Sequence, residues 1–350
     1  MKKISVSILG ATGAVGQRFV ELLFDHPWFE IRHLCASANS AGKAYKDVVD
    51  WRVSASIPGS IANLVVENCV PNSDTQVAFS ALDSSVAGEI EERFANGGHI
   101  VISNSKNHRM DPDVPLLIPE INPDHLNLIK EQKGRFKNSK GFIVTNPNCS
   151  TIGLSIVLKP LDDAFGVKQV LVTTMQALSG AGYPGVASLD ALDNVVPFIG
   201  DEEEKMETEP LKILGKVVKG KIKYPNIKIS AQCNRVSVRD GHLESVELSF
   251  YKKPTPAQVA KVLAEFIGQP QRLNLPSAPS RPIIVREEID RPQPILDREV
   301  NRGMSVTVGR IRKSKVLDIK LTLLVHNTIR GAAGAAILNA ELLKAKSLIK

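Results

Sequence analysis

The sequence has 350 residues, which exceeds one ordinary domain and favours two. Hydrophobic residues make up 43% of it and charged residues 23%, as in soluble globular proteins, and no stretch approaches the ~18 consecutive apolar residues of a membrane span. The formal net charge is +7, but the basic residues are scattered among 37 acidic ones without a Lys/Arg run, so we expect small anionic ligands as partners, no nucleic acid and no membrane.

The first 150 residues alternate β-branched runs with helical stretches, which is the pattern of parallel α/β units. Helices are predicted at Val15–Phe24, at Asp83–Ala95 with Asp83 as its N-cap, and at Thr151–Leu161. Strands are predicted at Ile4–Leu9, Ile31–Ala36, Gln76–Ala81, His99–Ser103 and Ile143–Asn146.

Long strand-like stretches dominate the second half of the chain. Helices are predicted there at Glu203–Leu214 and Pro256–Ile267. We therefore expect a second, α+β domain with a mixed, largely antiparallel sheet. Its strands are predicted at Lys168–Ala177, Ile229–Val238, Leu243–Tyr251, Ser305–Arg312 and Leu317–Val325.

The last segment, Thr328–Ile349, is rich in Ala and Leu and has helical periodicity. Its small residues suit close packing, and we expect it to return to the first domain. The predicted division is a first domain over 1–148, completed by a C-terminal helix over 327–350, and a second domain over 149–326.

A glycine-rich loop, Gly10-Ala11-Thr12-Gly13-Ala14-Val15-Gly16, joins the first predicted strand to the first helix. Glycine permits the tight turn and lets backbone N–H groups approach a pyrophosphate at the helix N-terminus. A plain tight turn is the alternative interpretation. The strand–turn–helix context favours a Rossmann-type dinucleotide-binding domain, in which the cofactor contacts Gly10, Thr12, Gly13, Ala14 and Val15.

The second predicted strand ends without a carboxylate, in Ser37-Ala38-Asn39-Ser40-Ala41-Gly42-Lys43. An NAD-specific site usually presents Asp or Glu there to bind the ribose hydroxyls. Hydroxyls, loop amides and a lysine accept a 2′-phosphate, which a carboxylate would repel. We therefore predict NADP as the cofactor, with Ser37 and Ser40 at its phosphate. Lys43 either joins them or belongs to a polar surface loop.

The four cysteines are widely spaced and form neither a Cys-x-x-Cys pair nor a cluster with metal-ligand spacing. This usage predicts a reducing cytoplasm and no bound metal. At least three of the four are expected to be small buried hydrophobes. The four cysteines are Cys35, Cys69, Cys149 and Cys233.

Cys149 stands where a strand gives way to a helix, in Asn146-Pro147-Asn148-Cys149-Ser150-Thr151. A helix N-terminus favours the thiolate, and its free N–H groups can stabilise an oxyanion. This is the geometry that nucleophilic catalysis requires. A lone cysteine is more often a buried hydrophobe, so the motifs around Cys149 decide between the two interpretations.

The motifs PNCST (147–151) and GATGAVG (10–16) resemble those of the aspartate-semialdehyde dehydrogenase family. Together with further matching stretches they cover nearly the whole chain in order. The wording of Ser105–Arg109 is similar to the archaeal and fungal branch of that family. The further stretches are Ser103–Ser105, Arg109–Asp113, Gln176–Gly182, Arg235–His242 and His326–Gly334.

The resemblance implies a reaction and its catalytic residues. Cys149 would attack the acyl phosphate of 4-phospho-L-aspartate and form a thioester, and hydride from NADPH would reduce it to the semialdehyde. This reaction belongs to the biosynthesis of lysine, methionine, threonine and isoleucine. His242 would be the general acid/base, since imidazole titrates near neutral pH, and Gln176 would orient the thiol or the intermediate.

The resemblance also implies binding residues. Arg235 would hold the substrate α-carboxylate, because a guanidinium grips a carboxylate with two hydrogen bonds. Glu202 would hold the ammonium, with Glu203 as its alternative. Arg109 and Lys205 would hold the phosphate. The residues expected at the cofactor are, in addition to those above, Ser80, Ser179, Gly180, Gly182 and Asn327.

Three alternatives stay open at this point. N-acetyl-γ-glutamyl-phosphate reductase and malonyl-CoA reductase share the thioester chemistry with other substrates. A non-catalytic dinucleotide-binding protein could use the same fold. The family resemblance further implies that the second domain forms the subunit interface of a homodimer or homotetramer.

Overall fold

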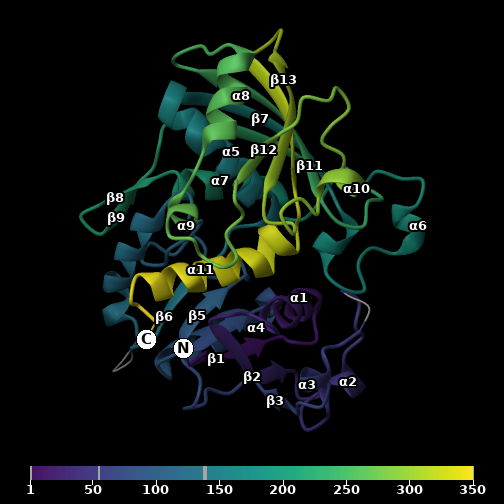
Figure 1. The fold of residues 1–350 in the computed structure, drawn as a ribbon, viewed down its shortest axis with the longest axis vertical. Helices are drawn as coiled ribbons and strands as arrows, with labels where there is room; N and C mark the ends of the chain where they lie inside the picture. The colour runs from purple at the N-terminus through teal and green to yellow at the C-terminus, as the bar shows by residue number, and fades with distance from the viewer. Residues whose placement is uncertain (1, 54–55, 137–139, 350) are drawn as a thin grey trace.

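The computed structural model describes residues 2–53, 56–136 and 140–349, which fold around two six-stranded sheets (Figure 1). The first sheet has the strand order β3-β2-β1-β4-β5-β6, and all its pairs are parallel. Burial on both faces explains its continuous apolar runs. The strands are β1 (Ile4–Leu9), β2 (Phe29–Ala36), β3 (Val66–Asn68), β4 (Val77–Ser80), β5 (Ile100–Ser103) and β6 (Phe142–Thr145).

The order of this sheet reverses between β1 and β4, beside the glycine loop. In doubly wound folds, such a reversal opens a crevice for ligands at the carboxyl ends of the strands. Helix α1 (Ala14–Leu23) starts at the end of the loop and buries Phe19, Val20 and Leu23. Helix α4 (Ser84–Asn96) is capped by Asp83, which accepts from the Ser85 N–H at 2.9 Å, so that predicted cap is confirmed.

The second sheet has the order β10-β7-β11-β14-β13-β12. Its three central pairs are antiparallel and its two edge pairs are parallel, so the predicted mixed, largely antiparallel sheet is confirmed. The predicted α/β fold class with a Rossmann-type sheet is confirmed as well. The strands are β7 (Val167–Gln176), β10 (Lys228–Arg235), β11 (His242–Phe250), β12 (Ile283–Val285), β13 (Val306–Lys313) and β14 (Ile319–Val325).

Two long helices pack against strands of the second sheet. Helix α5 (Cys149–Phe165) packs on the second sheet, where a side chain at Gly153 would strike Val325. Helix α7 (Glu202–Ile213) packs beside β10. The remaining elements are α2 (Tyr45–Val48), α3 (Gly59–Ala62), η1 (Pro123–Gly134), η2 (Leu178–Ala181), α6 (Ser188–Ala191), β8 (Lys216–Val218), β9 (Lys221–Lys223), α8 (Pro256–Glu265), α9 (Gln269–Arg272) and α10 (Pro294–Asp297).

The C-terminal segment lies between the two sheets (Figure 1). It begins as a π-helical turn, η3 (Ile329–Ala333), and continues as α11 (Gly334–Ala345). Leu338 and Leu342 of α11 are fully buried in the core of the first sheet, whereas Ala335 packs in the core of the second. We propose on this basis that the C-terminal segment completes the domain over 1–148, with 149–326 as the other domain.

The structure contains several short elements and one twelve-residue 3₁₀ segment, η1, that the sequence analysis did not predict. The strands β3, β8, β9 and β12 have three residues each. They are too short to show an alternation of apolar and polar residues, so the sequence pattern did not predict them. The last predicted helix begins with a π turn, a feature often found at functional sites. No helix in the described ranges is long and apolar enough to cross a bilayer.

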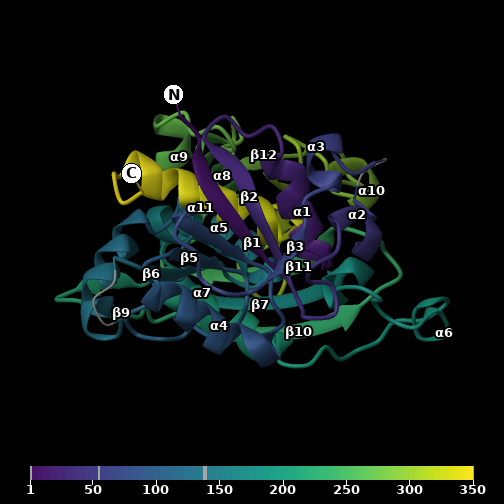
Figure 2. The ribbon, with the colours of Figure 1, turned by 90° about the horizontal axis from the view of Figure 1, so that it is seen from below.

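The loop that carries α6 stands out from the body of the molecule (Figures 1 and 2). Several large apolar side chains on and near it are exposed. Leu189 is 89% exposed, and Leu192 and Phe198 are 62% and 70% exposed. An apolar arm of this kind favours association with another surface.

Candidate active site

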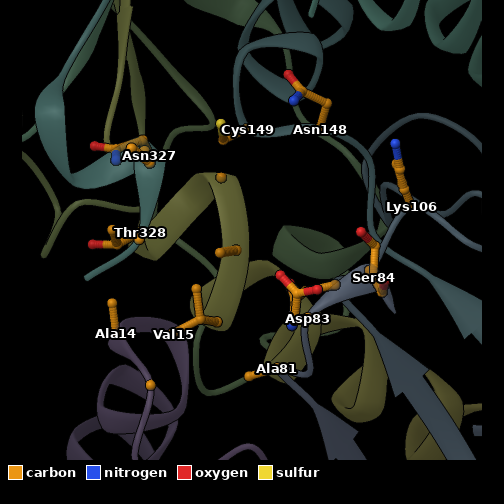
Figure 3. Close-up of a pocket in the computed structure, with 18 of the residues that line it drawn as sticks. Ala14, Val15, Ala81, Asp83, Ser84, Lys106, Asn148, Cys149, Asn327 and Thr328 are labelled. Carbon is orange, nitrogen blue, oxygen red and sulfur yellow. The ribbon is translucent and has the colours of Figure 1, made fainter. Parts of the chain in front are cut away.

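A cleft of about 840 Å³ opens at the carboxyl ends of β1 and β4, between the two sheets. Figure 3 shows Asn148 and Cys149 on one wall and Ala14 and Val15 on the opposite wall, with Asn327 at one side. The cleft therefore brings together segments from both halves of the chain. Of the predicted site residues, those lining it are Gly10, Thr12, Gly13, Ala14, Val15, Ser37, Arg109, Cys149, Gln176, Ser179, Gly180, Gly182, Glu202, Lys205, Arg235 and Asn327.

Cys149 is the first residue of α5. The preceding residue, Asn148, caps the helix: its side-chain oxygen accepts from the N–H groups of Ser150 (3.0 Å) and Thr151 (3.4 Å). The cap uses these two N–H groups but not the N–H of Cys149, so the role of the helix N-terminus in stabilising an oxyanion stays a prediction. The C-terminal segment closes on the thiol, since a Cβ at Gly331 would lie 2.7 Å from the Cys149 Cβ.

His242 lies directly beside the thiol although it is 93 residues away in the chain. Its Nε2 is 3.1 Å from the Cys149 Sγ. Its Nδ1 faces the backbone N–H of Ala177 at 3.0 Å, and because an N–H can only donate, Nδ1 is an acceptor. The neutral ring therefore carries its proton on Nε2. This N–H points at the sulfur and is a hydrogen-bond donor for any oxygen that develops negative charge there.

Burial governs the charges of this pair. Loss of water, and to a smaller extent the nearby Glu202 carboxylate, raise the pKa of Cys149 to about 12. Burial lowers the pKa of His242 to about 3, and the positive charge of Arg235 acts in the same direction. The expectation that the helix N-terminus yields a thiolate is thus wrong for the free protein. Removing water from the sulfur outweighs the helix dipole, and both groups are neutral at pH 7.

Gln176 and Glu202 form a hydrogen-bonded cluster beside the thiol. The Gln176 amide donates to Glu202 Oε2 at 3.1 Å, and the Asn148 amide lies 2.9 Å from both carboxylate oxygens of Glu202. Lys205 Nζ pairs with Glu202 at 3.0 Å. The alternative carboxylate, Glu203, accepts instead from the backbone N–H of Cys233 on β10. The geometry therefore favours Glu202 as the carboxylate at the cleft.

Two buried arginines from different segments line the cleft. Arg235, at the end of β10, donates from Nη1 to the Ala177 carbonyl at 2.8 Å. Arg109 donates to the Asn104 carbonyl at 2.7 Å and pairs with Glu209 at 2.9 Å. A further cation, Lys106, lines the cleft and pairs with Asp201 at 2.5 Å. Sequence reasoning missed Lys106, although it lies within the matching stretch that ends at Arg109.

The glycine loop presents backbone to the cleft. Gly10 has a φ of +80°, and a Cβ there would lie 2.7 Å from the Ala81 carbonyl oxygen. A Cβ at Gly16 would lie 2.1 Å from the Gly10 carbonyl oxygen. Gly13, the N-cap of α1, has no side chain to occupy the first-turn N–H groups, and Ala14 and Val15 of this turn line the cleft. This cradle fits the pyrophosphate of a dinucleotide.

The serines predicted at the cofactor divide into two groups. Ser37 lines the cleft, and Ser179 does so while accepting from the Asn327 amide at 2.7 Å. Ser40 is not among the described residues that line the cleft. Ser80 is fully buried and donates to Glu91 at 2.6 Å, so its hydroxyl does not face a cofactor. A buried carboxylate needs such donors, which the sequence pattern did not reveal.

Lys43, like Ser40, is not among the described residues that line the cleft. Its ammonium donates to the Asn39 carbonyl at 3.0 Å, within the same loop. This contact fits the polar surface loop, which was one of its two interpretations.

The chain matches two family models, the semialdehyde dehydrogenase NAD binding domain over residues 5–129 and the semialdehyde dehydrogenase dimerisation domain over residues 158–330. It is 51% identical to the aspartate-semialdehyde dehydrogenase of Schizosaccharomyces pombe, over 98% of this chain and 99% of that one. The chain belongs to the aspartate-semialdehyde dehydrogenase family.

Other members of the family extend the likeness. The aspartate-semialdehyde dehydrogenase of Archaeoglobus fulgidus is also 51% identical, over 99% of this chain and all of that one. Among solved structures, aspartate semialdehyde dehydrogenase with NADP from Candida albicans superposes with a TM-score of 0.91 at 44% identity, covering 99% of this chain and 100% of that one. The predicted likeness to archaeal and fungal members of the family is confirmed.

Proposed function

We propose that this protein is an NADP-dependent aspartate-semialdehyde dehydrogenase. It reduces 4-phospho-L-aspartate reversibly to L-aspartate 4-semialdehyde and phosphate, in the biosynthesis of lysine, methionine, threonine and isoleucine. One observation carries the proposal: the Cys149 thiol lies 3.1 Å from the His242 imidazole, in a cleft that also holds two arginines and the glycine loop. The relatives named above and the NADP-containing structure from Candida albicans support it.

In the first half-reaction, Cys149 Sγ attacks the acyl carbon of the substrate. A carbon–sulfur bond forms, the bond from that carbon to the phosphate oxygen breaks, and the thiol proton leaves on the released phosphate. His242 Nε2–H donates to the charge that develops at the acyl site. This donation adds to that of the first-turn N–H group that the Asn148 cap leaves unused, the N–H of Cys149. Gln176, fixed by Glu202, orients the intermediate.

In the second half-reaction, the carbon–sulfur bond breaks and the aldehyde forms. NADPH, when bound, supplies a hydride to the acyl carbon. His242 holds the carbonyl oxygen through Nε2–H, and the sulfur takes back a proton as the aldehyde leaves. The residues that would hold the cofactor are the Gly10–Val15 loop at the pyrophosphate, Ser37 at the ribose phosphate, and Ser179, Gly180, Gly182 and Asn327 at the nicotinamide. Ser40 stays a predicted contact of the 2′-phosphate, whereas the buried Ser80 hydroxyl donates to Glu91 and is assigned no contact with the cofactor.

Charged side chains would anchor the substrate. Arg235 pairs with the α-carboxylate, and Glu202 pairs with the ammonium. Arg109 and Lys205 bind the phosphate. All four line the cleft with Cys149. Charge-assisted contacts to buried groups are the strong ones, so together they select an amino acid with an acidic end.

The test is an assay with aspartate semialdehyde, NADP and phosphate, followed by NADPH formation. We expect turnover with this substrate and not with malonyl-CoA or N-acetyl-γ-glutamyl phosphate in the reductive direction. The Cys149→Ser variant should lose at least about 1,000-fold in kcat and still bind NADP. An acyl adduct on Cys149 should be visible by mass spectrometry. Full turnover by Cys149→Ser would overturn the proposal.

We further propose that the protein works in the cytoplasm as a homodimer or homotetramer. The match to a dimerisation domain over 158–330 and the exposed apolar side chains near α6 support self-association. Four free cysteines support a reducing compartment. Sedimentation velocity measures the assembly, and a monomer at micromolar concentration would contradict it.

A further inference from the structure

Helix α7 places four ionisable residues on one face. Glu202, Lys205, Glu209 and Lys212 follow one another at three- and four-residue spacing, which aligns them along the helix. An amphipathic helix normally turns apolar residues inward. Here Glu202, Glu209 and Lys212 are instead buried, with 7%, 2% and 0% exposure. Buried charges are costly unless they are paired, so this face needs an explanation.

Glu209 uses its two carboxylate oxygens on two different segments. Its Oε1 accepts from Arg109 Nη1 at 2.9 Å, and its Oε2 accepts from the backbone N–H of Asn148 at 2.7 Å. Asn148 directly precedes Cys149 and caps its helix. One carboxylate therefore joins the guanidinium at the phosphate site to the residue next to the nucleophile.

Lys212 holds the backbone around Arg109. Its ammonium donates to the carbonyl oxygens of Arg109 (2.6 Å), Asp111 (2.7 Å) and Val114 (2.9 Å), which uses all three of its N–H groups. Burial lowers the pKa of Lys212 to about 8, so the ammonium form still predominates at neutral pH. The side chain of Arg109 is thus tied by Glu209 and its main chain by Lys212.

These contacts leave part of the guanidinium for a ligand. Arg109 Nη1 donates one N–H to Glu209, and Nη2 donates one N–H to the Asn104 carbonyl. Each of these two nitrogens carries a second N–H. Arg109 lines the cleft together with Cys149. A guanidinium held at two points and open at others is preorganised to bind a phosphate.

We propose that Glu209, seated with the help of Lys212, is a positioning residue for the phosphate: it sets the place of the Arg109 guanidinium relative to the Cys149 thiol. This inference rests on the proposed function, since it assumes that Arg109 binds the phosphate of an acyl phosphate. Glu209 touches neither substrate nor cofactor in this account. It acts through Arg109 and Asn148.

The test separates the two half-reactions in the oxidative direction. Semialdehyde and NADP without phosphate give a burst of NADPH as the acyl-enzyme forms, whereas steady turnover needs phosphate. In Glu209→Gln we expect the phosphate KM to rise about 10- to 100-fold, because a charge-assisted contact to Arg109 is lost. The burst rate and the KM for NADP should stay within about threefold of the wild type.

The controls use the same helix. Glu204→Gln removes an equal charge from an exposed position of α7 and should leave the phosphate KM unchanged. Glu209→Asp keeps the charge and should recover part of the phosphate affinity. Lys212→Met should also raise the phosphate KM, which provides an independent arm if Glu209→Gln does not fold, as judged by circular dichroism and NADP binding.

Two outcomes would overturn the inference. The phosphate KM could remain unchanged in folded Glu209→Gln, or the burst rate and the phosphate dependence could decline together, which is the pattern of a merely structural residue. Failure of the proposed function is a different result, since the wild type would then give no NADPH burst with the semialdehyde.

Discussion

The two walls of the cleft are built in different ways. The cofactor wall is made of backbone: Gly10 and Gly16 admit the close turn, and the uncapped N-terminus of α1 faces the cleft. The substrate wall is made of buried charged side chains, among them Arg109, Arg235 and Glu202, which come from distant segments. Steric fit therefore governs the first wall, whereas burial and charge govern the second.

The pH dependence of thiol reactivity is the sharpest test of the substrate wall. Because the pKa of Cys149 is raised to about 12, only a small fraction is thiolate at pH 7, and that fraction grows as the pH rises. The alkylation rate of Cys149 by iodoacetamide should increase about tenfold per pH unit from pH 7 to 10. Mass spectrometry identifies the modified residue. A plateau at neutral pH would contradict the dominance of burial.

Glu202→Gln should have the next largest effect. It removes the charge that we assign to the substrate ammonium, so kcat/KM for aspartate semialdehyde should fall about 100-fold, with little change in NADP affinity. Because Glu202 also raises the pKa of Cys149, alkylation should become faster in this variant. The matched variant is Glu203→Gln, whose carboxylate faces the Cys233 backbone, and it should bind substrate normally. Equal losses in both variants would contradict the assignment.

Gly10→Ala tests the cofactor wall. The new Cβ meets the Ala81 backbone at 2.7 Å in a residue with positive φ, so we expect a loss of about 3 kcal/mol in unfolding free energy and about tenfold in NADP affinity. Gly98 has a similar φ of +92° with no atom within 4 Å of the added Cβ. Gly98→Ala should therefore cost only about 1 kcal/mol and leave NADP affinity unchanged. Urea unfolding measures the free energy of unfolding of each variant, and fluorescence titration measures its NADP affinity. Equal NADP affinities of the two variants would contradict a steric role of Gly10.

Ser37→Asp should have the smallest effect. A carboxylate at Ser37 repels the 2′-phosphate, so the preference for NADP over NAD in kcat/KM should fall about tenfold. Ser40→Asp is the comparison variant, because Ser40 is not among the described residues that line the cleft. If Ser40→Asp changes the preference as much as Ser37→Asp, the two serines share the phosphate as the sequence first suggested.

Local features of the site could be predicted from the sequence, whereas features that depend on distant segments could not. The glycine loop, the Asp83 cap and the position of Cys149 at a helix N-terminus were all readable locally. The direction of the Ser80 hydroxyl was not, because it depends on Glu91, which packs against it from α4. The charged face of α7 has a plain helical spacing, but whether such a face is buried or solvated depends on what packs on it.

The two kinds of sheet, the dinucleotide loop and the family of the chain could be predicted from the sequence, because periodicity, turn chemistry and motif order are properties of neighbouring residues. Three features required the folded chain: His242 lies 3.1 Å from the Cys149 thiol, burial favours the neutral form of both groups, and Glu209 joins Arg109 to the cap of the catalytic helix. Desolvation and pairing depend on segments 61 to 100 residues apart, and no local pattern contains that information.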